Sequence, residues 1–197
     1  MSDKRILTMQ DISCVGQCSL TVALPIISAA GVECGVLPTA VLSTHTMFKN
    51  YTFRDLTEDL PDIKNHWKSE NISFDGIYTG YIGSTKQIGY IKDIIDTFKK
   101  EKDIVCVDPA MADNGALYPG FDDAFVEAMK GLCKKADYLV PNITEAAMMA
   151  GMPYQEIQDE EYMMAMLNKL ADLGAKYVVL TGYTPAPNRI GVISLDT

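Results

Sequence analysis

The sequence predicts an α/β protein with three layers, in which a mainly parallel central sheet is flanked by helices. Two observations lead to this fold class. Short apolar runs alternate with longer segments of helical periodicity, and Gly, Pro or Asn residues separate the two kinds of segment. Strands that alternate with helices of this length form βαβ units, whose strands run parallel.

The apolar runs define seven predicted strands, which cover residues 5–9, 34–40, 76–79, 104–107, 138–140, 176–181 and 189–195. Helical spacing predicts helices over residues 18–30, 84–100, 121–134, 142–150 and 159–173. Residues 54–70 are polar and partly helical, with Trp67 as an apolar anchor. Ser84 suits a helix N-cap, whereas Gly31, Gly151 and Gly174 are typical helix ends.

Composition and charge exclude several classes of protein. The chain has 197 residues, of which 48% are hydrophobic, and this is enough for a single domain, 1–197, with a sizeable core. It carries 17 basic and 26 acidic residues, a net charge of −9. Because nonspecific nucleic-acid and anionic-membrane binding both need a basic surface, neither partner is expected.

The five cysteines and the start of the chain predict a cytoplasmic protein with reduced thiols. Their number is odd, they lack zinc-ligand spacing, and the chain begins Met-Ser-Asp-Lys-Arg without an apolar signal region. The apolar runs are far shorter than the roughly 20 residues that span a bilayer.

Acidic and amide side chains follow two predicted strands that are neighbours along the chain. Asp108 and Asp113 follow the strand at 104–107, and Asn142 and Glu145 follow the strand at 138–140. Because ligands of open α/β sheets bind at the carboxyl ends of strands, this set predicts a site for a divalent metal and a polyphosphate. Two simpler interpretations stay open: Asp108-Pro109 as an ordinary turn, and Asn142 with Glu145 as a helix capping box.

Three further strand ends carry polar or aromatic residues. Asp11 lies in the predicted turn at 10–19, His45 and Thr46 follow the second strand, and Tyr81 lies between two glycines after the third. These loops suit a polar heteroaromatic ligand, although loops that bond their own backbone and a packed tyrosine explain them equally well. The glycine motifs of dinucleotide-binding and P-loop proteins are absent from the sequence.

The order of these segments resembles the pyridoxal kinase family of the ribokinase-like superfamily, and the resemblance covers about residues 5–195. It is carried by Gln10-Asp11, Ser43-Thr44-His45-Thr46, Thr79-Gly80-Tyr81-Ile82-Gly83-Ser84, Asp108-Pro109-Ala110-Met111, Pro141-Asn142-x-x-Glu145 and Val179-Leu180-Thr181-Gly182. The resemblance implies phosphorylation of the 5′-hydroxymethyl group of pyridoxal, pyridoxamine or pyridoxine (the B6 vitamers), with ATP and Mg²⁺. It also implies a homodimer.

The resemblance also implies residue roles. The vitamer pocket would be lined by Asp11, His45, Thr46 and Tyr81. The ATP phosphates and Mg²⁺ would face Asp108, Asp113, Asn142, Glu145 and Thr181, with Asp108 and Glu145 nearest the metal. Such a transfer depends on positioning and charge neutralisation.

Two departures from the family pattern affect the expected chemistry. Many members have Ser where this chain has Asp11. A carboxylate there can pair with a protonated ring nitrogen or with a substrate amine, and the second partner favours pyridoxamine. The family's Gly-x-Gly-Asp motif, which supplies the catalytic base, is absent from the 197 residues, so the fold is predicted to be incomplete at the C-terminus, with the base beyond Thr197. The alternatives are a hydroxymethylpyrimidine kinase of the same superfamily and a non-catalytic ligand-binding protein.

Overall fold

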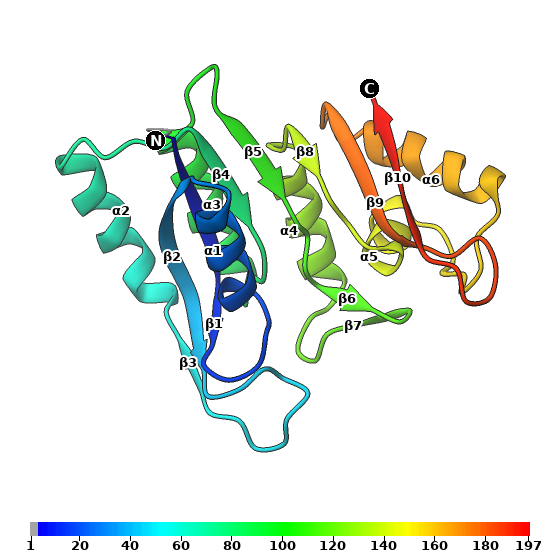
Figure 1. The fold of residues 1–197 in the computed structure, drawn as a ribbon, viewed down its shortest axis with the longest axis horizontal. Coiled ribbons are helices and arrows are strands. Elements are labelled where there is room, and N and C mark those ends of the chain that lie inside the picture. Colours follow the sequence, from blue (N-terminus) through cyan, green and yellow to red (C-terminus); the bar gives the residue numbers. More distant parts are fainter. Residues whose placement is uncertain (1–3) are drawn as a thin grey trace. The chain divides into compact units, whose positions relative to one another are not determined.

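The computed structural model describes residues 4–197, and the chain divides into two compact units, Met1–Val105 and Cys106–Thr197 (Figure 1). The prediction that the chain begins without a signal region rests partly on residues 1–3, and these three residues lie outside the described part of the chain. Between residues 4 and 197, no helix is both long and apolar enough to cross a membrane. Each unit is described by itself.

The first unit contains a four-stranded array in the order β4-β1-β2-β3. The strands are β1 (Arg5–Ser13), β2 (Glu33–Leu42), β3 (Phe53–Asp55) and β4 (Gly76–Thr79). β1 pairs in parallel with both β2 and β4, whereas the short β3 runs antiparallel to β2. Leu7, Met9 and Leu37 are fully buried in these strands, so they form the centre of the unit's core.

The helices of this unit are α1 (Leu20–Ala29), the 3₁₀ turn η1 (Thr57–Asp59), α2 (Leu60–Ser69) and α3 (Thr85–Phe98). In the view of Figure 1, α1 lies in front of β1 and β2, and α3 lies behind the strands. Ile88, Ile91 and Ile95 bury the inner face of α3, and Ser84 caps it by accepting the Gln87 amide hydrogen at 3.2 Å.

α1 differs from the other helices of its unit because its apolar side chains stay exposed. Leu20 is its buried residue, whereas Leu24 is 37% exposed and Ile26 is 63% exposed. A helix this apolar would normally bury a broad face, so α1 leaves an apolar surface on the unit.

The second unit has four strands in the order β10-β9-β8-β5 and a separate hairpin, β6-β7. Their bounds are β5 (Ile104–Val107), which begins at the end of the first unit, β6 (Ala112–Asp113), β7 (Ala116–Leu117), β8 (Tyr138–Leu139), β9 (Tyr177–Tyr183) and β10 (Gly191–Asp196). β8 pairs in parallel with β5 and β9, whereas β10 is antiparallel to β9.

Three helices complete the second unit: α4 (Asp123–Cys133), α5 (Ile143–Ala150) and α6 (Glu160–Ala171), all behind the strands in Figure 1. Each begins with a polar N-cap whose side chain accepts a backbone hydrogen three residues on; the caps are Asp122, Asn142 and Asp159. α5 ends at Gly151, whose φ of 62° is the left-handed conformation that glycine adopts without strain.

The predicted α/β class, with a mainly parallel sheet flanked by helices, is confirmed, and the strands at 76–79 and 104–107 match β4 and β5. One prediction of detail was wrong. β1 continues to Ser13, because a register shift between Gln10 and Ile12 lets it keep pairing with β2, so Asp11 lies in a strand and not in a turn. The segment at 54–70 is helical in part, as predicted, and it also contains the end of β3. The β6-β7 hairpin was not predicted.

Candidate functional site

In the first unit, the buried carboxylate of Asp11 lies at the register shift of β1. Asp11 is 5% exposed and follows Gln10 at the point where the pairing with β2 slips. Its Oδ2 atom accepts a hydrogen bond from the Ser13 hydroxyl at 3.2 Å. A buried carboxylate needs compensating partners, and a single neutral hydroxyl leaves acceptor capacity for a cationic or hydrogen-bonding ligand.

Tyr81 lies near Asp11, in the turn that joins β4 to α3. Burial raises the pKa of the Tyr81 phenol to about 12, and the negative charge of Asp11 adds to this shift, followed by Tyr51 and Asp55. The phenol is therefore neutral at physiological pH and keeps its O–H as a donor. The structure thus brings Tyr81 and Asp11, two of the predicted vitamer-binding residues, into one electrostatic environment.

The other two predicted vitamer residues lie on the loop between β2 and β3. The His45 ring covers Gly16, accepts the Met47 amide hydrogen on Nδ1 at 3.3 Å, and meets the Phe48 ring edge-on at 4.8 Å. Thr46 is exposed. The structure therefore orients His45 through its neighbours, and it leaves Thr46 at the surface.

In the second unit, the predicted capping box at the start of α5 is formed completely. The Glu145 amide donates to Asn142 Oδ1 at 2.9 Å, and the Asn142 amide donates to Glu145 Oε2 at 2.8 Å. The second carboxylate oxygen, Oε1, accepts the Met111 amide hydrogen at 3.2 Å. Glu145 therefore joins the first turn of α5 to the segment that follows β5.

Two more hydrogen bonds attach the β6-β7 hairpin to the same helical turn. Asn142 donates from Nδ2 to the carbonyl oxygen of Ala112 at 2.8 Å, and the Gly115 amide donates to the Thr144 hydroxyl at 3.1 Å. The segment that contains Asp108 and Asp113 is thus held against the N-terminus of α5, where unpaired amides and the helix dipole favour anions.

Asp108 and Glu145 are two carboxylates that interact electrostatically. Glu145 is 2% exposed, and burial raises its pKa to about 8, with the charge of Asp108 as the next cause, although the amides of Asn142, Met111 and Ala112 oppose the shift. Two electrostatically coupled carboxylates, one after β5 and one in the first turn of α5, suit a divalent cation, which would stabilise both in their ionised form.

The described part of the chain holds no group of three or more His, Cys, Asp or Glu residues arranged around a metal position. This is compatible with Mg²⁺, which commonly takes one or two carboxylates and completes its coordination with water and substrate phosphates. The donor set therefore fits a magnesium ion that arrives with a phosphate ligand.

The remaining two predicted residues of this set lie at its margin. Asp113 is exposed, and its Oδ1 atom accepts the Asn114 amide hydrogen at 2.8 Å. Thr181 forms a bridge with Asn142, and its hydroxyl donates to the Pro141 carbonyl oxygen at 3.3 Å. Thr181 is therefore adjacent to the start of α5. The Asp113 carboxylate instead accepts a hydrogen bond within the turn of the β6-β7 hairpin.

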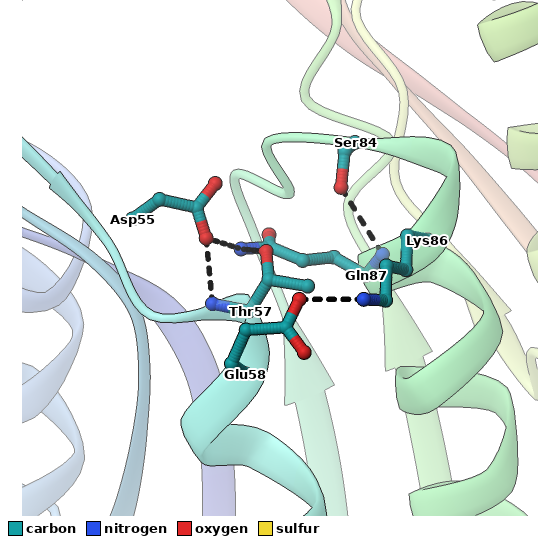
Figure 2. Close-up of polar contacts among 6 residues, drawn as sticks. All are labelled: Asp55, Thr57, Glu58, Ser84, Lys86 and Gln87. Atoms are coloured by element: carbon teal, nitrogen blue, oxygen red, sulfur yellow. Dashed lines mark hydrogen bonds and ion pairs between the residues drawn. The ribbon is translucent and has the colours of Figure 1, made fainter.

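Sequence reasoning missed one buried polar residue beside the Tyr81 turn. Gln87 is fully buried, and its side-chain amide bonds to several segments of the first unit (Figure 2). The signal was present, because Ser84-x-x-Gln87 has the spacing of a capping box. In a capping box the Gln87 side chain would accept the amide hydrogen of Ser84. Here it accepts the amide hydrogen of Gly83 instead.

The fold is ribokinase-like, and the solved structures that resemble it include kinases. The phosphomethylpyrimidine kinase family model matches residues 24–191. The chain is 36% identical to the pyridoxal kinase of Lactobacillus plantarum, with a TM-score of 0.89 over 99% of this chain and 69% of that one. The chain belongs to the phosphomethylpyrimidine kinase family, and the predicted relationship to pyridoxal kinases is confirmed.

Two more relatives support this assignment. A Bacteroides thetaiotaomicron protein, assigned as a phosphomethylpyrimidine kinase and crystallised with pyridoxal, is 37% identical, with a TM-score of 0.93 over 99% of this chain and 69% of its own. The pyridoxal kinase of Dictyostelium discoideum is 26% identical over an aligned length of 199 residues, which covers 97% of this chain. The chain spans 64% of the length of that curated relative.

Proposed function

We propose that this chain takes part in the ATP-dependent phosphorylation of the 5′-hydroxymethyl group of pyridoxal, pyridoxamine or pyridoxine. The proposal rests chiefly on one observation: the Asp108–Glu145 carboxylate pair at the N-terminus of α5, in a chain 37% identical to a protein crystallised with pyridoxal. We also propose that residues 1–197 belong to one ribokinase-like domain and that the protein is cytoplasmic.

The vitamer would be held by the first unit through Asp11 and Tyr81, with His45 and Thr46 beside it. The neutral Tyr81 phenol can stack its ring on a pyridine ring and donate a hydrogen bond from its O–H. The buried Asp11 carboxylate would accept hydrogens from a cationic amine, which favours pyridoxamine.

The nucleotide phosphates would be held by the second unit. The first turn of α5 offers positive potential, Asn142 and Thr181 lie beside it, and Asp113 is near on the hairpin. Asp108 and Glu145 would hold Mg²⁺ directly or through water. Such an ion neutralises phosphate charge during transfer.

Two other functions stay as candidates. A hydroxymethylpyrimidine kinase is favoured by the family model, whose description names that chemistry. A protein that binds the same ligands without turnover is the second, since the chain has no Gly-x-Gly-Asp motif.

We further propose a homodimer, because α1 leaves Leu24 and Ile26 exposed on an apolar helix.

Calorimetry with pyridoxal, pyridoxamine and hydroxymethylpyrimidine tests the proposed substrate class. We expect binding of the vitamers and weaker binding of hydroxymethylpyrimidine, whereas the opposite preference would reject the proposal. A coupled assay with ATP and Mg²⁺ on the same preparation separates a kinase from a binding protein. Vitamer binding without turnover would favour the non-catalytic alternative for this chain.

A matched pair of variants connects the binding to the site. Tyr81→Leu should abolish vitamer binding because it removes the aromatic face and the phenol. Tyr90→Leu should leave binding intact, because Tyr90 lies on α3 with Lys86 above its ring and is not among the residues proposed to hold the vitamer.

A further inference from the structure

Gln87 occupies the third position of α3, where most helices place a solvent-facing residue. Its exposed fraction is 0%, so its amide must find protein partners for both its donors and its acceptor. Nε2 donates to the carbonyl oxygen of Thr39 at 3.0 Å and to the Thr57 hydroxyl at 2.8 Å, and Oε1 accepts the Gly83 amide hydrogen at 2.8 Å. The amide is therefore satisfied by three separate segments of the first unit.

Two of these contacts fix the turn that carries Tyr81. Thr39 donates from its hydroxyl to the carbonyl oxygen of Tyr81 at 3.0 Å, while its own carbonyl accepts from Gln87. Gly83, two residues after Tyr81, is held by Gln87 itself. The backbone from the Tyr81 carbonyl to the Gly83 amide is thus tied to β2 and to α3 by a closed chain of hydrogen bonds.

The third contact includes the segment after β3. Asp55 Oδ1 accepts the Thr57 amide hydrogen at 2.6 Å, and Gln87 Nε2 lies 3.5 Å from the same oxygen (Figure 2). Asp55 is also among the groups whose charge raises the pKa of Tyr81. Gln87 therefore connects the Tyr81 turn with an acidic residue that shares its electrostatic environment.

We propose that Gln87 is a positioning residue that, together with Thr39, holds the Tyr81 turn in the orientation that binds the vitamer ring. The proposal rests on the proposed function of the Tyr81 site. Gln87 is not the sole link between these elements, because the exposed Glu58–Lys86 ion pair, at 2.5 Å, also joins η1 to α3 (Figure 2). Burial of the Gln87 amide costs desolvation, which its hydrogen bonds to Thr39, Thr57 and Gly83 offset.

The test compares Gln87→Met, which keeps length and loses the hydrogen bonds, with Lys86→Met, which breaks the exposed link between the same elements. Ser84→Ala serves as the stability control, since it removes the α3 cap and leaves the Gln87 side chain in place. Calorimetry measures the dissociation constant for pyridoxal and pyridoxamine, and native-state hydrogen exchange measures protection of the Gly83 amide.

We expect Gln87→Met to weaken vitamer binding about tenfold, which is a loss of about 1.4 kcal/mol, and to raise Gly83 exchange at least as strongly. Both controls should stay within about twofold of wild type. Thr39→Val should weaken binding similarly, and the double variant should be no weaker than the worse single one, because both residues act on one turn.

Three outcomes overturn the proposal: unchanged Gly83 protection in Gln87→Met, unchanged vitamer affinity despite faster exchange, or an equal loss of affinity in Ser84→Ala. A wild-type chain that binds no vitamer would instead reject the proposed function. The exchange measurement would still decide whether Gln87 holds the turn.

Discussion

The His45 ring lies directly over Gly16: a β-carbon built on Gly16 would come 2.2 Å from the His45 Cδ2 atom. Gly16 also has φ of 105°, a conformation that residues with a side chain rarely adopt. The loop after β1 thus approaches the loop after β2 closely. The His45 ring can occupy this position because Gly16 has no side chain.

Gly16→Ala should displace His45, because the added methyl group and the imidazole cannot occupy the same space. Backbone strain adds a destabilisation of about 1–3 kcal/mol. With two histidines in the sequence, ¹H–¹⁵N spectra can follow the His45 ring against His66 as an internal reference. Gly174→Ala is the control, since its φ is 98° and an added β-carbon meets no atom within 4 Å. Unchanged His45 resonances in Gly16→Ala would contradict the contact.

Stability should fall as pH rises through the titration of Glu145. Its pKa is raised in the folded state to about 8 from an ordinary value of 4.5, so the folded chain holds this proton more tightly than the unfolded chain does. Its contribution is complete below pH 4.5 and is lost toward pH 8, by at most about 1.4 kcal/mol per pH unit.

Urea unfolding of Glu145→Gln from pH 4 to 9 checks this, because the variant should lose the downward slope. Glu127→Gln, which alters an exposed carboxylate paired with Lys130, should retain it. Added Mg²⁺ should also flatten the wild-type slope by favouring the ionised form. Identical slopes for wild type and Glu145→Gln would contradict the assignment.

Asp11→Ser should shift the vitamer preference away from pyridoxamine. The substitution removes a buried charge that would pair with the protonated amine, so we expect about a tenfold loss of pyridoxamine affinity relative to pyridoxal, or about 1.4 kcal/mol. Calorimetry on both ligands gives the ratio, and the exposed Asp62→Ser provides the control. A constant ratio would exclude Asp11 as the group that senses the amine.

Ile26→Glu should prevent self-association if α1 packs against a second copy of the chain in the dimer interface. A charge there meets a large desolvation cost in an apolar interface. Sedimentation velocity would show a dimer for wild type and a monomer for the variant. Val192→Glu is matched, because Val192 and Ile26 are each 63% exposed. A wild-type chain that stays monomeric at all concentrations would reject the homodimer.

Local chemistry explains which parts of the fold the sequence predicts well. Ser84, Asn142 and Gly151 mark helix ends because capping uses one side chain or one backbone conformation, and the structure has each as expected. β4 matches its predicted run because Asp75 and Gly80 bound a short apolar segment. These signals act within a few residues and need no tertiary context.

The errors have a tertiary origin. The apolar run that predicts the first strand ends at Met9, which places Asp11 in a turn, yet pairing with β2 on both sides of the register shift extends β1 past it. The β6-β7 hairpin has two residues in each strand, too few for a periodic pattern. Gln87 is polar in sequence and buried in the structure because its partners come from segments up to 48 residues away.

The attachment of the β6-β7 hairpin to α5 has a consequence for motion. A hairpin this short is marginally stable by itself, so its order comes from the bonds to Asn142, Thr144 and Glu145. Opening it requires breaking these bonds, and two of the side chains that make them, Asn142 and Glu145, also form the capping box of α5. Hairpin and helix start therefore behave as one cooperative unit of local unfolding, and the segment after β5 is not an independent flap.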